Sequence, residues 1–177
     1  MENVINYSRT RNVKQPNRGT LKSAGIDFFV PEFTEQFIND LQSKNPDLSS
    51  IKEGTYQVVI LNDRLLIGPG QRVLIPSGVK MNIPAGRALM AKNKSGVGSK
   101  KGLDKLAELV DEDYQGEIHI NVVNTSNEIV EIKPNEKLIQ FVEVAVFYST
   151  PNEVLINELF PEVTERGEGG FGHTNKA

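Results

Sequence analysis

The chain has 177 residues, which is enough for one compact domain with a hydrophobic core and short for two. Its 38% hydrophobic and 24% charged residues are typical of globular proteins, which excludes a disordered or membrane-embedded chain. A formal net charge of -3 gives no general attraction to nucleic acid, so any recognition of phosphate must be local.

The residue types that are rare or missing narrow the chemistry further. The absence of cysteine excludes disulfides, thiolate nucleophiles and thiolate metal sites. The two histidines, His119 and His173, are too isolated for a histidine cage, so a metal would be held by oxygens. Because no run of about 18 apolar residues occurs, we expect no association with a membrane. The absence of cysteine favours a cytoplasmic protein, and the net charge of -3 predicts no nucleic-acid partner.

Short alternating or β-branched runs, separated by Gly, Pro, Asn and Asp, predict an all-β antiparallel sandwich or barrel. The predicted strands are Val4 to Tyr7, Tyr56 to Leu61, Leu65 to Ile67, Arg72 to Ile75, Val79 to Ile83, Ala88 to Ala91, Ile118 to Asn124, Ile129 to Ile132 and Leu138 to Tyr148. Predicted turns lie at 61–64, 68–70, 76–78 and 84–86. Such regular spacing disfavours βαβ units, which need longer connections.

Residues 32–54 depart from this pattern. Apolar residues recur at helical spacing from Phe33 to Leu41, and Asn45 and Pro46 form a stop, which predicts one short amphipathic helix followed by a polar loop. We interpret residues 32–54 as an insert in a single β-domain that covers residues 1–164.

Residues 165–177 are polar and glycine-rich and cannot form a core. They predict a flexible C-terminal arm, for which two interpretations stay open. One is an ordinary mobile terminus. The other is an arm that grips phosphate, because glycine lets backbone N–H groups approach an anion, Arg166 supplies several donors, and Phe171 offers a flat face to a base.

Two earlier segments carry polar groups beside strands. Asp27 lies between apolar residues in SAGIDFF, so we expect its side chain to point away from the core, as a solvent-facing or functional acid. KNKSGVGSKKGL, residues 92–103, combines lysines, serines and glycines that suit phosphate oxygens, although its spacing is not that of a P-loop. A charged, solvated loop is the equal alternative.

Two later segments complete the candidate chemistry. Three adjacent acids, residues 111–113, precede Tyr114 and a turn at Gly116. Such acids repel one another, so the run persists either because solvent screens it or because a function needs a carboxylate. In the functional interpretation one acid deprotonates a water while the tyrosine ring packs on a substrate. Gln140 is a neutral amide between Ile139 and Phe141. It could donate a hydrogen bond to a phosphate, or it could be an ordinary polar residue of an edge strand.

These segments resemble, in order and spacing, the five motifs of the trimeric dUTPase family. Residues 24–27 match Ala-Gly-Tyr-Asp, 94–96 match Arg-Ser-Ser/Gly, 110–116 match Ile-Asp-x-Asp-Tyr-x-Gly, 135–140 match Gly-Asp/Glu-Arg-Ile-Ala-Gln, and 166–174 match Arg-Gly-x-Gly-Gly-Phe-Gly-Ser/Thr-Thr. The resemblance covers nearly the whole chain apart from residues 32–54. Short inserts of this sort are typical of phage or other mobile-element versions, which would place the protein in a host cytoplasm.

The resemblance implies a jelly-roll homotrimer with three active sites, each built from several subunits. It implies hydrolysis of dUTP to dUMP and pyrophosphate with Mg²⁺, which keeps uracil out of DNA and supplies dUMP for dTMP synthesis. The implied catalytic residue is Asp111, which activates the water that attacks the α-phosphorus in line. Mg²⁺ is held chiefly by the triphosphate, with Asp27 nearby through water.

The resemblance also assigns the substrate contacts. Ser95 and Gln140 hold phosphate oxygens, Tyr114 packs on the deoxyribose and crowds out a 2′-hydroxyl, and the backbone of residues 106–110 recognises the uracil edge. Arg166 clamps the γ-phosphate and Phe171 covers the uracil. The full implied set is Lys94, Ser95, Gly96, Glu108, Leu109, Val110, Tyr114, Gln140, Arg166, Gly169, Gly170, Phe171, Gly172 and Thr174.

Three residues depart from the family pattern. Lys94 replaces an arginine, which exchanges a planar two-pronged donor for a point charge. Glu108 replaces a glycine in the base-recognising hairpin, and His173 replaces a serine.

Two alternatives remain. A dCTP deaminase has a similar fold, but its catalytic glutamate would fall at Asn121. A nucleotide-binding signalling module would act through a protein partner of insert 32–54.

Overall fold

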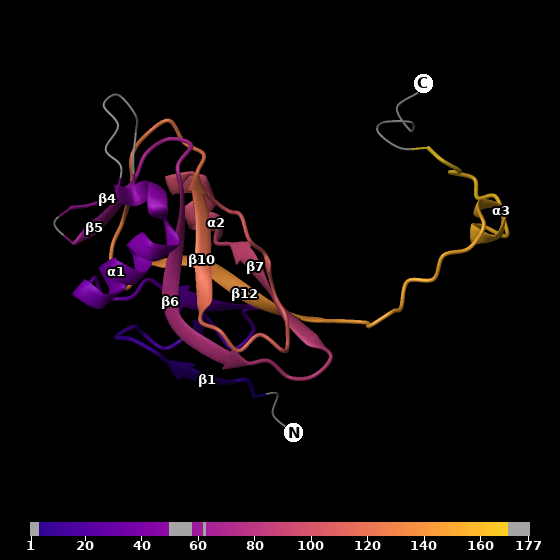
Figure 1. Ribbon diagram of the computed structural model, residues 1–177, viewed down its shortest axis with the longest axis horizontal. Coiled ribbons are helices and arrows are strands. Elements are labelled where there is room, and N and C mark those ends of the chain that lie inside the picture. The colour runs from indigo at the N-terminus through magenta and orange to yellow at the C-terminus, as the bar shows by residue number, and fades with distance from the viewer. Residues whose placement is uncertain (1–3, 50–57, 62, 170–177) are drawn as a thin grey trace. The chain divides into compact units, whose positions relative to one another are not determined.

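The computed structural model describes residues 4–49, 58–61 and 63–169. It divides the chain into two compact units, residues 1–147 and residues 148–177. We call these the β-unit and the C-terminal segment and describe each by itself (Figure 1). The boundary falls at residues 147/148, earlier than the predicted boundary at 164.

The β-unit contains three antiparallel sheets, which confirms the predicted fold class. The first sheet has the order β1 (Asn6–Arg9), β6 (Arg72–Asn82), β10 (Ile118–Asn124), β8 (Leu103–Lys105), and the second has the order β11 (Val130–Ile132), β5 (Arg64–Ile67), β4 (Val58–Leu61). The third has the order β2 (Asn17–Arg18), β3 (Gly25–Phe29), β12 (Lys137–Ala145), β7 (Arg87–Asn93), β9 (Leu109–Val110). The described strands form an open arrangement and no closed barrel.

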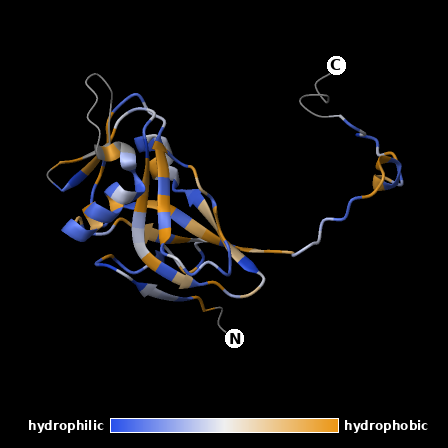
Figure 2. Ribbon diagram, in the orientation of Figure 1, coloured by the Kyte–Doolittle hydropathy of each residue, from blue (hydrophilic) through white to orange (hydrophobic). Residues whose placement is uncertain are grey.

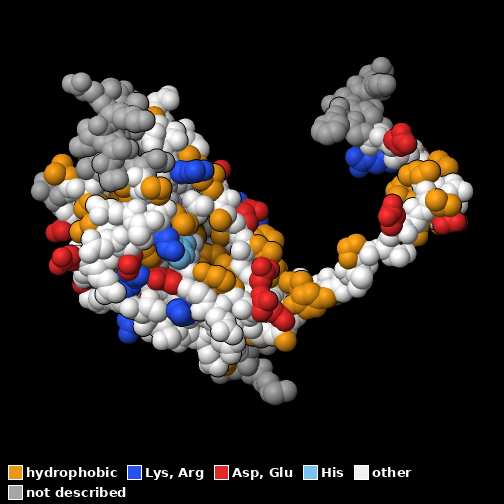
Figure 3. Space-filling view, in the orientation of Figure 1, with side chains coloured by type: hydrophobic (Ala, Val, Ile, Leu, Met, Phe, Trp, Pro, Cys, Tyr) orange, Lys and Arg blue, Asp and Glu red, His pale blue; other side chains and the backbone are white. Residues whose placement is uncertain are grey.

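The core follows from alternation along the strands. Every second residue of β10, from Ile118 to Asn124, is buried, as expected for a strand with one face toward a core. Phe28 of β3 and Phe141 of β12 meet there with ring centroids 4.6 Å apart. Figure 2 shows apolar residues interspersed with polar ones along the strands, and Figure 3 shows acidic and basic side chains intermixed on one face of the β-unit.

One predicted turn was wrong. Residues 76–78 lie inside the continuous strand β6 instead of ending it. The register to β10 shifts there, from Ile118 opposite Val79 to His119 opposite Pro76, so the extra residues form a bulge. Gly78 adopts a φ of 75°, and its N–H donates to the Glu117 carboxylate at 2.5 Å, so a bulge accommodates the residues that were expected to break the strand.

The predicted insert helix is confirmed as α1 (Glu35–Lys44), followed by a 3-10 helix, η1 (Pro46–Ser49). Thr34 caps α1 by accepting the N–H of Phe37 at 3.2 Å. Phe37 and Leu41 are fully buried, and Figure 1 shows α1 beside β6. The Asn45 side chain then bonds both the N–H and the C=O of Leu74 in β6, at 2.8 and 2.9 Å, which fixes the insert to the first sheet.

Two further helices were not predicted. They are α2 (Ser95–Lys101), in the segment expected to be a loop, and α3 (Ile156–Leu159), in the C-terminal segment. The glycines and serines of α2 favour helix weakly, so composition gave no signal. The helix ends at Gly102, whose φ of 66° suits glycine and whose N–H donates to the Gly98 carbonyl at 3.1 Å.

Because Phe37 is fully buried, Phe37→Ala should lower the free energy of unfolding by about 3–5 kcal/mol through lost burial and a residual cavity. Urea unfolding followed by circular dichroism measures this change. Gln42→Ala, on the exposed face of the same helix, should change stability by less than about 0.5 kcal/mol. Equal effects of the two substitutions would mean that α1 does not pack as described.

Candidate functional site

The first group of site residues lies at the end of β3, β12 and β7. Asp27 is buried, with 3% of its surface exposed. The prediction that its side chain points away from the core was therefore wrong. Lys94 Nζ lies 2.5 Å from Asp27 Oδ1, and Lys137 Nζ lies 2.9 Å from Asp27 Oδ2. A carboxylate between apolar neighbours is stable here because each oxygen has an ammonium partner. Residues of the first, second and fourth motifs therefore meet at one carboxylate.

These contacts fix the charge of Asp27. Burial raises the pKa of the Asp27 carboxyl, but hydrogen bonds and charge from Lys94 and Lys137 outweigh burial and hold that pKa below its ordinary value. The carboxylate stays ionised. Lys94, which stands where the family pattern has arginine, thus forms an ion pair with Asp27 of the first motif through its single ammonium group.

Gln140 lies beside this carboxylate. Its backbone is paired with Asp27 on one side and with Lys92 on the other. Its side-chain Nε2 donates to the Asn93 carbonyl at 3.1 Å. Gly25 leaves room for this amide, because a Cβ there would lie 2.2 Å from Gln140 Oε1. The glycine of the first motif and the glutamine of the fourth motif are therefore sterically matched.

Ser95 and Gly96 open α2 and are exposed. Their backbone N–H groups lie in the first helical turn, where a helix offers no carbonyl acceptor. The backbone of Asn135, at the first position of the fourth motif, has a φ of 66° in the turn before β12. Asparagine tolerates this left-handed conformation, so it can replace the glycine of the family pattern.

The second group lies after β9. Asp111 and Tyr114 are exposed, and the Tyr114 N–H donates to the Asp111 carbonyl at 3.2 Å. The Tyr114 hydroxyl donates to the Glu117 carbonyl at 2.9 Å. A Cβ at Gly116 would lie 2.3 Å from that hydroxyl oxygen, so the ring folds back over a residue that must lack a side chain. Within the described part of the chain, the Asp111 carboxylate has no hydrogen bond or ion pair, which leaves it available as a proton acceptor.

A cavity of about 200 Å³ adjoins this second group. Its lining includes residues 107–111, Tyr114 and His119. Glu108 turns its carboxylate to Lys105, which lowers the pKa of Glu108, and its carbonyl accepts the Ala91 N–H at 2.6 Å. Glu108 has no positive φ, so the backbone does not need the family's glycine. Burial lowers the pKa of His119 below its ordinary value, against the opposing effect of Glu117, which favours the neutral imidazole.

The two groups lie far apart within one chain. Val110 pairs with Leu89 of β7, and Asp111 follows at that end of the strand. Lys94 lies at the other end, five positions after Leu89, which corresponds to roughly 17 Å at the rise of a β-strand. Gln140 pairs with Lys92, three positions after Leu89, which corresponds to roughly 10 Å, so Asp111 and Lys94 lie toward opposite ends of β7 with Gln140 between them.

The C-terminal segment carries the fifth motif. Arg166 is exposed, and its Nε donates to the Gly169 carbonyl at 2.8 Å within a turn closed by Thr164. Gly167 has a φ of 51° in this turn. The remaining predicted residues of the motif, Gly170, Phe171, Gly172, His173 and Thr174, lie outside the described residues.

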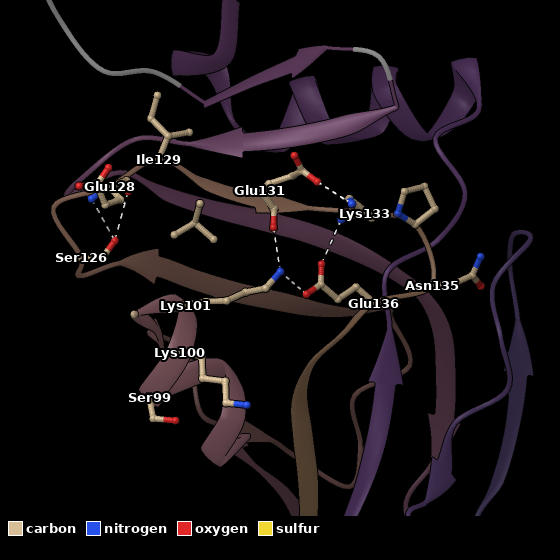
Figure 4. Close-up of a pocket in the computed structure, with 13 residues that line it drawn as sticks. Ser99, Lys100, Lys101, Ser126, Glu128, Ile129, Glu131, Lys133, Asn135 and Glu136 are labelled. Atoms are coloured by element: carbon tan, nitrogen blue, oxygen red, sulfur yellow. Dashed lines mark hydrogen bonds and ion pairs between the residues drawn. The ribbon is translucent and has the colours of Figure 1, made fainter.

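A second, larger cavity of about 760 Å³ contains none of the predicted site residues. It is lined by α2, β11 and the turns that flank β11 (Figure 4). Two of its three lysines are paired, Lys101 with Glu136 and the Glu131 carbonyl, and Lys133 with Glu131; Lys100 is the third. Because the smaller cavity, and not this one, is lined by Asp111 and Tyr114, it is the better candidate for the predicted chemistry.

Sequence reasoning did not single out several residues of these groups. Lys137 is the third residue of the fourth motif, and its position three residues before Gln140 is the signal that could have identified it. Asn93 accepts from Gln140, and His119 lines the cavity. Their contacts come from strand pairing and are not visible in sequence spacing.

The described residues also bear on metals and membranes. Among them, no cluster of three or more His, Asp or Glu side chains could hold a metal ion. The same part of the chain contains no helix that is long and apolar enough to cross a membrane.

Comparisons with known proteins bear on the family and the fold. The dUTPase family model matches residues 42–175. Deoxyuridine 5′-triphosphate nucleotidohydrolase of Fusobacterium nucleatum is 43% identical over 108 residues, 60% of this chain and 71% of the relative. The protein of the same name from Hydrogenovibrio crunogenus is 34% identical over 167 residues, 93% of this chain and 88% of the relative. The structure of Staphylococcus bacteriophage 80alpha dUTPase with dUpNHpp has a TM-score of 0.71 at 22% identity, over 97% of this chain and 98% of that one, and shares the fold.

The lowered pKa of Asp27 predicts a specific sensitivity to acid. The folded chain binds fewer protons at this group than the unfolded chain, so the stabilisation is present above about pH 4 and is lost as pH falls through the folded pKa. Asp27→Asn should flatten the pH dependence of the free energy of unfolding below about pH 4, measured by urea unfolding. Asp63→Asn, at an exposed turn, is the matched control and should keep the original slope. An unchanged slope for Asp27→Asn would contradict the ion pairs.

Proposed function

This chain belongs to the dUTPase family, and we propose that it hydrolyses dUTP to dUMP and pyrophosphate. The observation that carries the proposal is the exposed Asp111 carboxylate beside Tyr114, at the mouth of a small cavity. The reaction would keep uracil out of DNA and supply dUMP for dTMP synthesis. A cytoplasmic location suits this metabolism.

Asp111 is proposed to take a proton from water as that water attacks the α-phosphorus in line. An exposed carboxylate with no competing partner among the described residues suits this general-base step. The leaving group is pyrophosphate, and no covalent intermediate is required. Much of the remaining catalysis would come from positioning the triphosphate and neutralising its charge.

The first group of residues is proposed to hold the phosphates. Ser95 offers a hydroxyl and, with Gly96, backbone N–H groups at the start of α2, and Gln140 offers a neutral amide. Lys94 contributes positive charge while its ammonium group braces Asp27. From the arm, Arg166 would clamp the γ-phosphate and Phe171 would cover the uracil, with residues 169–174 closing on the nucleotide.

Tyr114 and the backbone of residues 108–110 are proposed to select the nucleoside. The tyrosine ring would pack on the deoxyribose and exclude a 2′-hydroxyl, and the β9 backbone would bond the uracil edge. The side chains of Glu108 and Leu109 are exposed, which leaves the backbone as the part suited to recognition.

Mg²⁺ is the proposed cofactor. The described residues suit an ion carried mainly by the triphosphate, because they contain no protein-only cluster of ligands, and both Asp27 oxygens already accept from lysine. Asp27 would contact the ion through water. When bound, Mg²⁺ would neutralise phosphate charge.

A homotrimer is the proposed assembly. Along β7 the backbone of Val110, next to Asp111, lies roughly 17 Å from Lys94, next to Ser95, and roughly 10 Å from the position of Gln140, which pairs with Lys92. In the proposed assembly, Asp111 of one copy would act with Ser95 and Gln140 of another. Insert 32–54 is a proposed contact for a protein partner, as an added role.

The reaction predicts a clear substrate preference. Purified protein with Mg²⁺ should release pyrophosphate from dUTP at least about 100-fold faster than from dCTP, dTTP or UTP, in keeping with loss of hydrogen-bonded base recognition. A coupled pyrophosphate assay measures the four rates. Equal rates, or none, would overturn the proposal, and ammonia release from dCTP would favour a deaminase instead.

The role of Asp111 predicts a separation of catalysis from binding. Asp111→Asn should reduce turnover about 10²–10⁴-fold because the water loses its base. Calorimetric titration with a non-hydrolysable dUTP analogue should give a dissociation constant within a few-fold of the original. Asp63→Asn is again the control and should keep full turnover. Parallel loss of turnover and binding would assign Asp111 to binding instead.

A further inference from the structure

Arg11 lies between the insert helix and the loop that carries Tyr114. Its guanidinium contacts Glu117 through two bonds, Nε to Oε1 at 3.1 Å and Nη2 to Oε2 at 2.8 Å. The third nitrogen, Nη1, lies 3.0 Å from Oδ2 of Asp40 in α1. Only 13% of the Arg11 side chain and 16% of the Glu117 side chain are exposed. A planar guanidinium thus joins two carboxylates from segments far apart in the chain.

On the α1 side, the guanidinium is held by charge and by a ring. Arg11 Cζ lies 5.9 Å from the ring centroid of Phe37, one turn before Asp40. Phe37 is fully buried and stacks on Phe33, with centroids 5.0 Å apart and rings nearly parallel. The position of Arg11 therefore depends on the position of the insert helix.

On the pocket side, Glu117 is held at both its side chain and its backbone. Its Oε1 also accepts the Gly78 N–H at 2.5 Å, and its backbone carbonyl accepts the Tyr114 hydroxyl at 2.9 Å. The tyrosine ring also lies against Gly116, where a Cβ would lie 2.3 Å from the hydroxyl oxygen. A displacement of Glu117 would therefore move the acceptor that fixes the ring.

The charge of Arg11 is maintained by its partners. Burial would lower the pKa of Arg11, but Glu117 and then Asp40 raise it above its ordinary value. Removing Arg11 from its largely buried pair with Glu117 leaves an uncompensated charge, which forces the local structure to rearrange. The contact with Asp40, which is 42% exposed, contributes less. The ion pair of Arg64 with Glu131 joins β5 to β11 in a different sheet and serves as a control.

We propose that Arg11 is a positioning residue that couples the insert helix α1 to Tyr114 and thereby sets the discrimination between deoxyribose and ribose. The inference rests on the proposed role of Tyr114 in dUTP hydrolysis. Through this coupling, the insert contributes to the substrate specificity of the site. A partner that binds the insert would alter substrate choice through the same three side chains.

The test compares kcat/KM for dUTP with kcat/KM for UTP. Asp40→Asn releases only the α1 side of the link and, because Asp40 is 42% exposed, should fold. It should lower the dUTP-to-UTP ratio about threefold, mainly through KM, and Arg11→Met should lower it further because it also removes the buried partner of Glu117. Arg64→Gln removes an ion pair away from Tyr114 and should leave the ratio within twofold of the original.

A double variant decides whether Asp40 acts through Arg11. The ratio for Asp40→Asn combined with Arg11→Met should equal that for Arg11→Met alone, and additive losses would overturn the coupling. If Arg11→Met does not fold, Asp40→Asn decides by itself: an unchanged ratio with normal dUTP hydrolysis overturns the inference and leaves the function intact. No dUTP hydrolysis by the unsubstituted protein would instead overturn the proposed function.

Discussion

The pairing of the buried Asp27 carboxylate with Lys94 and Lys137 organises the part of the β-unit where the first, second and fourth motifs meet. A charge with 3% of its surface exposed is tolerable only with partners, and these partners come from the start of α2 and from β12. Satisfying one carboxylate therefore brings three motifs together that are far apart in sequence. Gln140, whose side chain is confined between Gly25 and the Asn93 carbonyl, completes the same arrangement.

The length of β7 is a second constraint. The strand β9 pairs with one end of β7, and α2 begins after the other end. The length of β7 therefore separates Asp111, which follows β9, from Lys94 and Ser95. The proposed homotrimer would bring Asp111 of one copy to the phosphate-binding residues proposed for another.

The insert is integrated into the β-unit. Phe37 and Leu41 bury its apolar face, the Asn45 side chain extends the bonding of β6, and Arg11 ties α1 to Glu117. An added segment that was attached only by its ends would have little influence on the cavity beside Tyr114. This one is joined through Arg11 to Glu117, whose carbonyl accepts the Tyr114 hydroxyl.

The sequence by itself determined the β class, the insert helix and the family, because alternation, helical spacing and ordered motifs are local properties of the chain. It failed at Pro76 to Gly78, where a bulge opposite β10 absorbs residues that break an isolated strand. It failed again at Asp27, whose burial depends on lysines 67 and 110 positions later. Only the tertiary structure decided which distant partners satisfy each buried charge and how far apart the motifs lie, since both follow from strand pairing, which short sequence patterns do not encode.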